Sequence, residues 1–119
     1  MTVKLVVLKS GEDVITDLQE MMSDDKVIGY FLKFPCKVGL YGEKNDVEGN
    51  KKTPFQLQLT PWIPLTNDEV IPIPADWVVT IVEPVEKLKE MYLKGLKNYE
   101  DRKSKADSSD EQSDSSESD

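Results

Sequence analysis

VKLVVLKSGEDVITDL, residues 3–18, places two runs of apolar and mostly β-branched residues on either side of a short polar turn. β-branched side chains favour strands, and Gly11 tolerates the positive φ that a tight hairpin turn requires. We therefore expect the chain to open with a β-hairpin. We interpret this hairpin as the beginning of a small, twisted barrel.

The segment after the hairpin predicts one turn and one long strand. Residues 23–26, SDDK, carry short polar side chains that can hydrogen-bond their own backbone, so the second strand should end there. Residues 27–34 are apolar on both faces, which is typical of a covered strand, and residues 36–41 resume an alternating pattern. We expect one long, bent strand with a bend or bulge at Gly29 and interrupted pairing at Pro35.

Polar segments alternate with short strands in the second half of the chain. Residues 42–53 have almost nothing to bury and predict an exposed hairpin loop. Residues 70–74 and 77–82 predict the last two strands, of which the second should close the sheet. Residues 55–60, FQLQLT, alternate with a period of two, so their apolar side chains should face the core: Phe55, Leu57 and Leu59.

Residues 84–100 predict a terminal helix that completes a single domain of residues 1–103. Pro84 suits the first helical turn, and Glu83 and Glu90 each precede a lysine by four positions. Residues 104–119 hold no apolar side chain larger than alanine and predict a disordered acidic, serine-rich tail. Apolar residues recur every three or four positions along the helix: Val85, Leu88, Met91, Tyr92, Leu96 and Tyr99.

The charge of the chain is concentrated in this tail. Residues 104–119 contain six acids and Lys105, a net of −5, which leaves −3 of the total −8 for residues 1–103. Arg102 is the only arginine. Because nucleic acids are bound by clustered lysine and arginine, the composition argues against a large nucleic-acid footprint.

The sequence predicts a protein that stays in the cytoplasm and does not contact membranes. No apolar run approaches the roughly 18 residues of a membrane span, and no signal-peptide pattern opens the chain. Cys36 is the single cysteine and cannot form an intramolecular disulfide, which fits a reducing compartment.

No residue pattern predicts catalysis. The chain lacks histidine, the commonest general base and neutral metal ligand. Its adjacent carboxylates, such as Glu12 with Asp13 and Asp24 with Asp25, fall at predicted turns, where we expect them to be solvated. No phosphate-binding glycine loop is found. We therefore expect no enzyme, no catalytic residue, no metal site and no cofactor.

Two segments resemble the motifs of Sm-like proteins. Residues 3–18, with an apolar strand, a Lys-x-Gly turn and a second strand, resemble the first Sm motif, and residues 70–81, VIPIPADWVVTI, are similar to the second. The polar loop at residues 42–53 matches the variable loop of that family. More narrowly, the chain resembles the Sm-like proteins of cyanophages and related marine phages.

This resemblance implies a five-stranded, strongly bent SH3-like barrel with a C-terminal helix. It implies a homo-oligomeric ring that assembles edge to edge through the fourth and fifth strands. It also implies binding of RNA, or of other single-stranded nucleic acid, without catalysis, in a role that modulates host or phage transcripts. A phage-encoded chain would act in the cytoplasm of the host cell.

The chain departs from the family pattern where Sm proteins hold RNA. Pro74 and Ala75 stand where an Arg-Gly pair is typical, and residues 24–28 replace an Asp-x-x-Met-Asn pattern. The usual uridine-binding residues therefore do not carry over. For RNA binding we look to Lys26 for a phosphate contact and to Tyr30 or Trp77 for base stacking, although either aromatic could instead belong to the core or a subunit interface.

Two alternatives stay open. The missing Arg-Gly pair and the acidic balance favour a protein-interaction scaffold that retains the ring and has lost RNA binding. A monomeric SH3-like or OB-like barrel outside the Sm family is the third interpretation.

Overall fold

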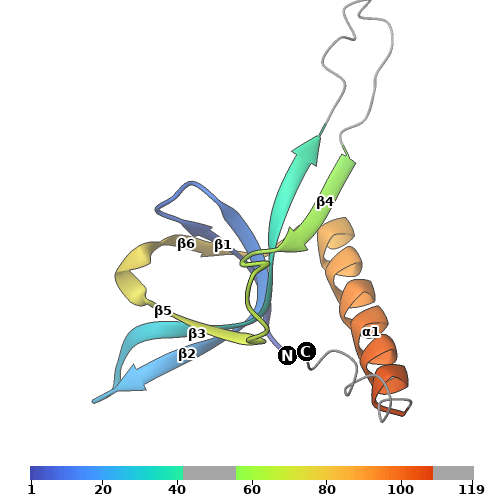
Figure 1. The fold of residues 1–119 in the computed structure, drawn as a ribbon. Coiled ribbons are helices and arrows are strands. Elements are labelled where there is room, and N and C mark those ends of the chain that lie inside the picture. The colour runs from blue at the N-terminus through green and yellow to red at the C-terminus, as the bar shows by residue number, and fades with distance from the viewer. Residues whose placement is uncertain (42–55, 109–119) are drawn as a thin grey trace, which may run out of the picture.

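The structure is a computed structural model that describes residues 1–41 and 56–108. It is a mainly β fold with an open, antiparallel sheet of six strands and a C-terminal helix (Figure 1). The strands pair in the order β4-β3-β2-β1-β6, and β5 also pairs with β3. The elements are β1 (Val3–Leu8), β2 (Asp13–Ser23), β3 (Lys26–Tyr41), β4 (Gln56–Pro61), β5 (Val70–Pro74), the 3-10 helix η2 (Ala75–Trp77), β6 (Val78–Val82) and α1 (Glu86–Ser108).

The opening hairpin is confirmed. β1 and β2 pair in antiparallel register from Val3 opposite Asp17 to Val7 opposite Asp13. Gly11 has a φ of +92°, which side chains with a Cβ rarely adopt, and its N–H donates to the Leu8 carbonyl over 2.8 Å.

The turn predicted at residues 23–26 is also confirmed. β2 ends at Ser23, and β3 begins at Lys26. Asp24 and Asp25 both have positive φ, 53° and 63°. Aspartate tolerates this region because its short side chain can hydrogen-bond locally, and two positive values give the tight turn that matches strand twist.

The long strand predicted over residues 27–41 corresponds to β3, whose pairing with β2 shifts register twice. At the first shift, Met21 pairs with Gly29 and Met22 pairs with Val27, so Ile28 is an extra residue. A Cβ added to Gly29 would lie 2.6 Å from the Ile73 carbonyl oxygen of β5. The predicted bulge at Gly29 is therefore confirmed, and glycine allows β5 to approach closely there.

The second shift surrounds Phe34 and Pro35. Ile15 pairs with Cys36 and Asp17 pairs with Lys33, so two residues of β3 face the single residue between them on β2. Phe34 has a φ of 51°, which bends the strand. Pro35 has no N–H to donate. Because it lies in this irregular segment, the regular part of the ladder keeps all its donors.

β4 and β5 behave as two halves of one interrupted strand. β4 pairs with Cys36–Tyr41 of β3 and β5 pairs with Gly29–Lys33, both antiparallel. Residues 62–69 leave the sheet between them, opposite only two residues of β3. The number of five strands is thus corrected to six: the prolines at 61 and 64 cannot donate to a ladder, so β4 ends before the chain returns to β3.

The sheet curls so that its distant parts are joined by a single turn. β5 pairs with β3 and β6 pairs with β1, on opposite sides of β2. η2 connects β5 directly to β6 and spans this separation (Figure 1).

Both faces of the sheet are covered by apolar side chains. Successive residues of a strand point to opposite faces, so Ile15 and Val14 belong to different clusters. We call the cluster under α1 the helix-side core; it contains Val3, Ile15, Leu88, Tyr92 and Leu96. Leu57 and Leu59 pack against it, as their alternation predicts, whereas Phe55 lies outside the described residues. The opposite cluster contains Val6, Leu8, Val14, Leu32 and Ile73.

The helix is longer than the sequence predicts. α1 begins two residues after Pro84 and continues to Ser108, past the predicted end at residue 100 and the domain boundary at residue 103. Its predicted inner face is correct for Leu88, Tyr92 and Leu96, which are buried, but Val85 precedes the helix and is exposed. Glu83 also precedes it, and its carboxylate pairs with Lys4. The loop at 42–53 and residues 109–119 of the predicted tail lie outside the described residues.

Candidate functional site

The three residues proposed for RNA contact lie on two elements, β3 and η2, at one end of the sheet. Lys26 begins β3, Tyr30 lies further along it, and Trp77 ends η2. Tyr30 pairs with Ile73, which brings this part of β3 beside the strand that leads to Trp77. We call this region the loop end, made of residues 9–12, 24–26 and 75–77. Figure 1 shows it on the side of the molecule opposite α1.

Trp77 is the most accessible aromatic group of the loop end. Its side chain is 42% exposed, and its backbone carbonyl accepts a hydrogen bond from the Lys9 N–H over 3.0 Å. The Lys9 ammonium lies 5.9 Å from the centroid of the indole ring, within the range of a cation–π contact. The first hairpin turn therefore holds Trp77 in place and adds a positive charge next to it.

Tyr30 and Lys26 occupy different environments. Tyr30 is half-buried and packs against the cluster around Leu32, so most of its ring serves the core. Lys26 is exposed and pairs with Ser23 at the end of the β2–β3 hairpin. The structure brings the elements of the three residues to one end, but it shows no hydrogen bond, ion pair or ring contact among these three side chains.

Carboxylates accompany these cations. Asp24 and Asp25 are exposed directly before Lys26, and Asp76 is exposed directly before Trp77. The loop end thus carries charges of both signs, unlike the dense positive patches that track a phosphate backbone.

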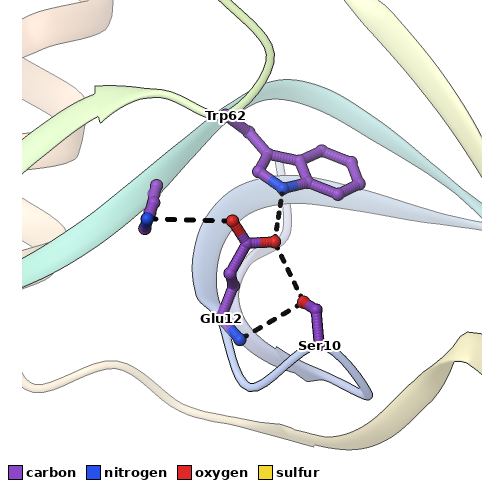
Figure 2. A network of polar contacts seen from close by, with 4 residues as sticks. Ser10, Glu12 and Trp62 are labelled. Carbon is purple, nitrogen blue, oxygen red and sulfur yellow. Dashed lines mark hydrogen bonds and ion pairs between the residues drawn. The ribbon is translucent and has the colours of Figure 1, made fainter.

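A polar network ties the first hairpin to the segment after β4 (Figure 2). The carboxylate of Glu12 accepts hydrogen bonds from the Trp62 indole N–H over 3.1 Å and from the Ser10 hydroxyl over 2.9 Å. Lys37 lies 3.8 Å from its other oxygen. The Trp62 bond and then the Ser10 bond lower the pKa of Glu12; burial opposes them, and Lys37 adds a weaker lowering effect. Glu12, which the sequence suggested to be merely solvated, instead anchors residues 62–69.

Tyr92 anchors α1 to the irregular part of the sheet. Its ring is buried, and its hydroxyl lies 2.9 Å from the Lys33 carbonyl and 3.1 Å from the Phe34 carbonyl, to which it can donate. The same hydroxyl accepts the Asp17 N–H over 3.1 Å. These backbone groups lie at the second register shift, where the ladder is irregular. Burial raises the pKa of Tyr92, so the hydroxyl keeps its proton.

A groove of about 660 Å³ runs between α1, β4 and residues 62–69; we call it the helix groove. Its walls are mainly apolar, and Arg102 of α1 and Glu69 lie among its polar residues. Glu69 accepts the Tyr99 hydroxyl over 2.6 Å and the Lys103 ammonium over 3.1 Å. The apolar lining includes Phe34, Leu57, Leu59, Met91, Leu96 and Tyr99.

The sequence alone did not single out Glu12, Trp62 or Tyr92 as partners. Glu12 and Trp62 are 50 residues apart, and Tyr92 lies 75 residues from Asp17, so no local pattern joins them. One local feature does indicate that Trp62 leaves the ladder: Pro61 and Pro64 lie on either side of it, and proline cannot donate a ladder hydrogen bond.

No cluster of three metal-ligating side chains is found among residues 1–41 and 56–108. Cys36 is half-buried, and burial raises the pKa of its thiol, which keeps it in the less nucleophilic neutral form. In the same described part of the chain, no helix is both long and apolar enough to cross a membrane.

Comparison with known proteins gives a family but no activity. No curated protein matches the chain. The profile of one family, described as a family of unknown function (DUF6561), matches residues 1–97, which is most of the chain. The chain therefore belongs to this family of unknown function.

Proposed function

We propose that the protein is an Sm-like subunit that assembles through its strand edges into a homo-oligomeric ring and binds single-stranded RNA at the loop end. The observation that carries this proposal is the connectivity of the sheet. If β4 and β5 count as one interrupted strand, the order is that of a five-stranded, bent barrel whose last two strands lie at its two ends.

Unpaired strand edges support assembly. Within the described residues, β6 pairs only with β1, and β5 pairs only with β3. Val79 of β6 is 62% exposed, and Val70 of β5 is 41% exposed. Exposed apolar edges promote uncontrolled association unless they are paired, and a closed ring of identical subunits would pair every one of them.

Trp77 supports the RNA contact. Single-stranded nucleic acids are commonly bound by stacking their bases on exposed aromatic rings beside cations. Trp77 is exposed and held next to Lys9, and Lys26 lies at the same end of the sheet. We assign base stacking to Trp77 and phosphate contact to Lys9 and Lys26, and we assign Tyr30 mainly to the core.

A second function has its own support. Carboxylates of Asp24, Asp25 and Asp76 border the same surface, and the residues at 74 and 75 are not the Arg-Gly pair that holds RNA in typical Sm proteins. These features favour a ring that serves as a protein-interaction scaffold without RNA.

Fluorescence anisotropy of labelled oligo-U and oligo-A distinguishes the two functions. RNA binding predicts saturable binding to the full chain at low salt, a steep loss at moderate salt, and a loss of about tenfold in affinity in Trp77→Ala. The Tyr99→Ala variant removes a similarly exposed aromatic ring from α1, on the side opposite the loop end, and serves as the matched control that should bind as the wild type does. No binding at low salt would contradict the RNA function and favour the scaffold.

A further inference from the structure

We propose that the helix groove binds an extended peptide segment with apolar side chains at alternate positions and an acidic side chain near Arg102. The groove lies on the α1 side of the molecule, away from the loop end (Figure 1). The proposal therefore stands apart from the RNA contact, and it leaves the edges of β5 and β6 to the ring.

The length of the groove fits a short strand. Its lining on α1 follows one face of the helix at Met91, Gly95, Tyr99 and Arg102. At a rise of 1.5 Å per residue these positions span about 16 Å, which is the length of about five residues of extended chain. The volume of 660 Å³ also lies within the range of pockets that hold specific ligands.

The outer edge of β4 supplies the partner for a peptide backbone. Within the described residues β4 pairs only with β3, so its other edge presents unpaired N–H and C=O groups. Leu57 and Leu59 pack on the helix side of the sheet, so Gln58 between them points to the other face. Because Gln58 also lines the groove, the groove reaches both faces of β4 and therefore extends over its outer edge. A lipid chain cannot satisfy backbone groups, whereas an added strand can hydrogen-bond them.

The apolar wall sets the side-chain requirement. Every second side chain of an added strand would point toward α1, where Leu96, Met91 and Tyr99 form the opposite wall. Gly95 leaves space between them, because a Cβ at this position would meet no atom within 4 Å. One apolar side chain of the peptide fits over Gly95.

Arg102 sets the charge requirement. It lines the groove near Glu69, but the Glu69 carboxylate is held by Tyr99 and Lys103. None of the ion pairs found in the described residues includes Arg102. A peptide carboxylate at that end could pair with its guanidinium. The chain's own residues 109–119 carry acids but no apolar side chains, so they do not meet the apolar requirement.

The test uses the full chain and two fluorescein-labelled hexapeptides. Both have valine at alternate positions with threonine between them. One peptide carries its single glutamate at the N-terminus, and the other carries it at the C-terminus. Anisotropy should show saturable binding of one of the two. Gly95→Leu should weaken it by about tenfold or more because leucine fills the space above residue 95. Arg102→Gln should weaken it by about threefold, Arg102→Lys should restore part of the loss, and neither should change binding of the matching peptide with glutamine in place of glutamate.

Lys97→Leu adds the same apolar side chain at an exposed helix position that does not line the groove, and it should bind as the wild type does. Circular dichroism confirms that each variant is folded, and amide NMR shifts should move at residues 56–60 on peptide addition. Absence of binding by every hexapeptide, or equal binding by Gly95→Leu, would overturn the proposal. A larger sedimentation mass for the wild type than for Gly95→Leu without peptide would also overturn it, because a second copy would then fill the groove.

Discussion

The helix side and the loop end of the same sheet are built differently. On the helix side, α1 covers the sheet, and the Tyr92 hydroxyl satisfies backbone groups of both β2 and β3. At the loop end, Trp77 and Lys26 remain exposed, and α1 lies on the opposite side of the molecule (Figure 1). The difference indicates that the Tyr92 contacts hold the fold together, whereas the exposed side chains of the loop end contribute little to its core. Substitution of Tyr92 should therefore lower stability, whereas substitution of Trp77 should change RNA binding and leave stability nearly unchanged.

The largest effect should come from Tyr92→Ala. Removal of a buried aromatic ring leaves a cavity in the helix-side core, so the free energy of unfolding should fall by about 3–5 kcal/mol. Tyr92→Phe keeps the ring and removes only the hydroxyl, and it should lose about 1–3 kcal/mol because the Asp17 N–H loses its partner. Urea unfolding followed by circular dichroism measures both. A Tyr92→Phe variant as stable as the wild type would show that the hydroxyl does not anchor α1.

Gly29→Ala should be the next in size. The added Cβ would lie 2.6 Å from the Ile73 carbonyl, a backbone atom that moves only if β5 shifts, so we expect a loss of about 1–3 kcal/mol. Gly39→Ala is the matched control, because the three atoms nearest its Cβ all belong to the exposed Tyr41 side chain, the closest at 3.0 Å, and this side chain can rotate away. Equal unfolding midpoints for the two variants would contradict the close approach of β3 and β5.

Glu12 predicts a smaller, pH-dependent effect. Its pKa is lowered from 4.5 in the folded protein, chiefly by the Trp62 hydrogen bond, so the folded state favours the carboxylate. The resulting stability is present above pH 4.5 and is lost as the pH falls through the lowered pKa. Glu12→Gln cannot titrate, so its unfolding free energy should fall less on acidification than that of the wild type. Parallel pH profiles for the two proteins would show that the network contributes nothing to stability.

Trp77→Ala should have the smallest effect on stability. The side chain is exposed and lies outside both core clusters, so the free energy of unfolding should change by about 0.5 kcal/mol or less. Thermal unfolding of this variant beside Tyr92→Phe compares the two sides of the sheet directly. A loss at Trp77 as large as that at Tyr92 would remove the distinction between a structural side and a binding end.

Local chemistry made much of the fold readable from the sequence. Gly11 marks the first turn, the aspartates at 24 and 25 mark the second, and Leu57 and Leu59 alternate as a half-buried strand requires. Each of these signals acts within a few residues. The predicted stripe on the helix likewise identified Leu88, Tyr92 and Leu96 as its buried face.

Contacts between distant residues account for what the sequence did not predict. Glu83 pairs with Lys4, 79 residues away, and Glu12 pairs with Trp62 across the fold. The end of α1 was placed too early because residues beyond 100 lack an apolar stripe, whereas a helix already packed at Tyr92 and Leu96 can continue without one. The pairing of Lys9 with Trp77 depends on the curl of the whole sheet and has no local signal.

The mass of the full chain in solution, measured by light scattering across a range of concentrations, tests the proposed Sm-like ring most directly. A ring predicts one species with a mass several times 13.5 kDa that does not change on moderate dilution. A constant mass of 13.5 kDa at every concentration would contradict it and would leave a monomeric β protein with free strand edges.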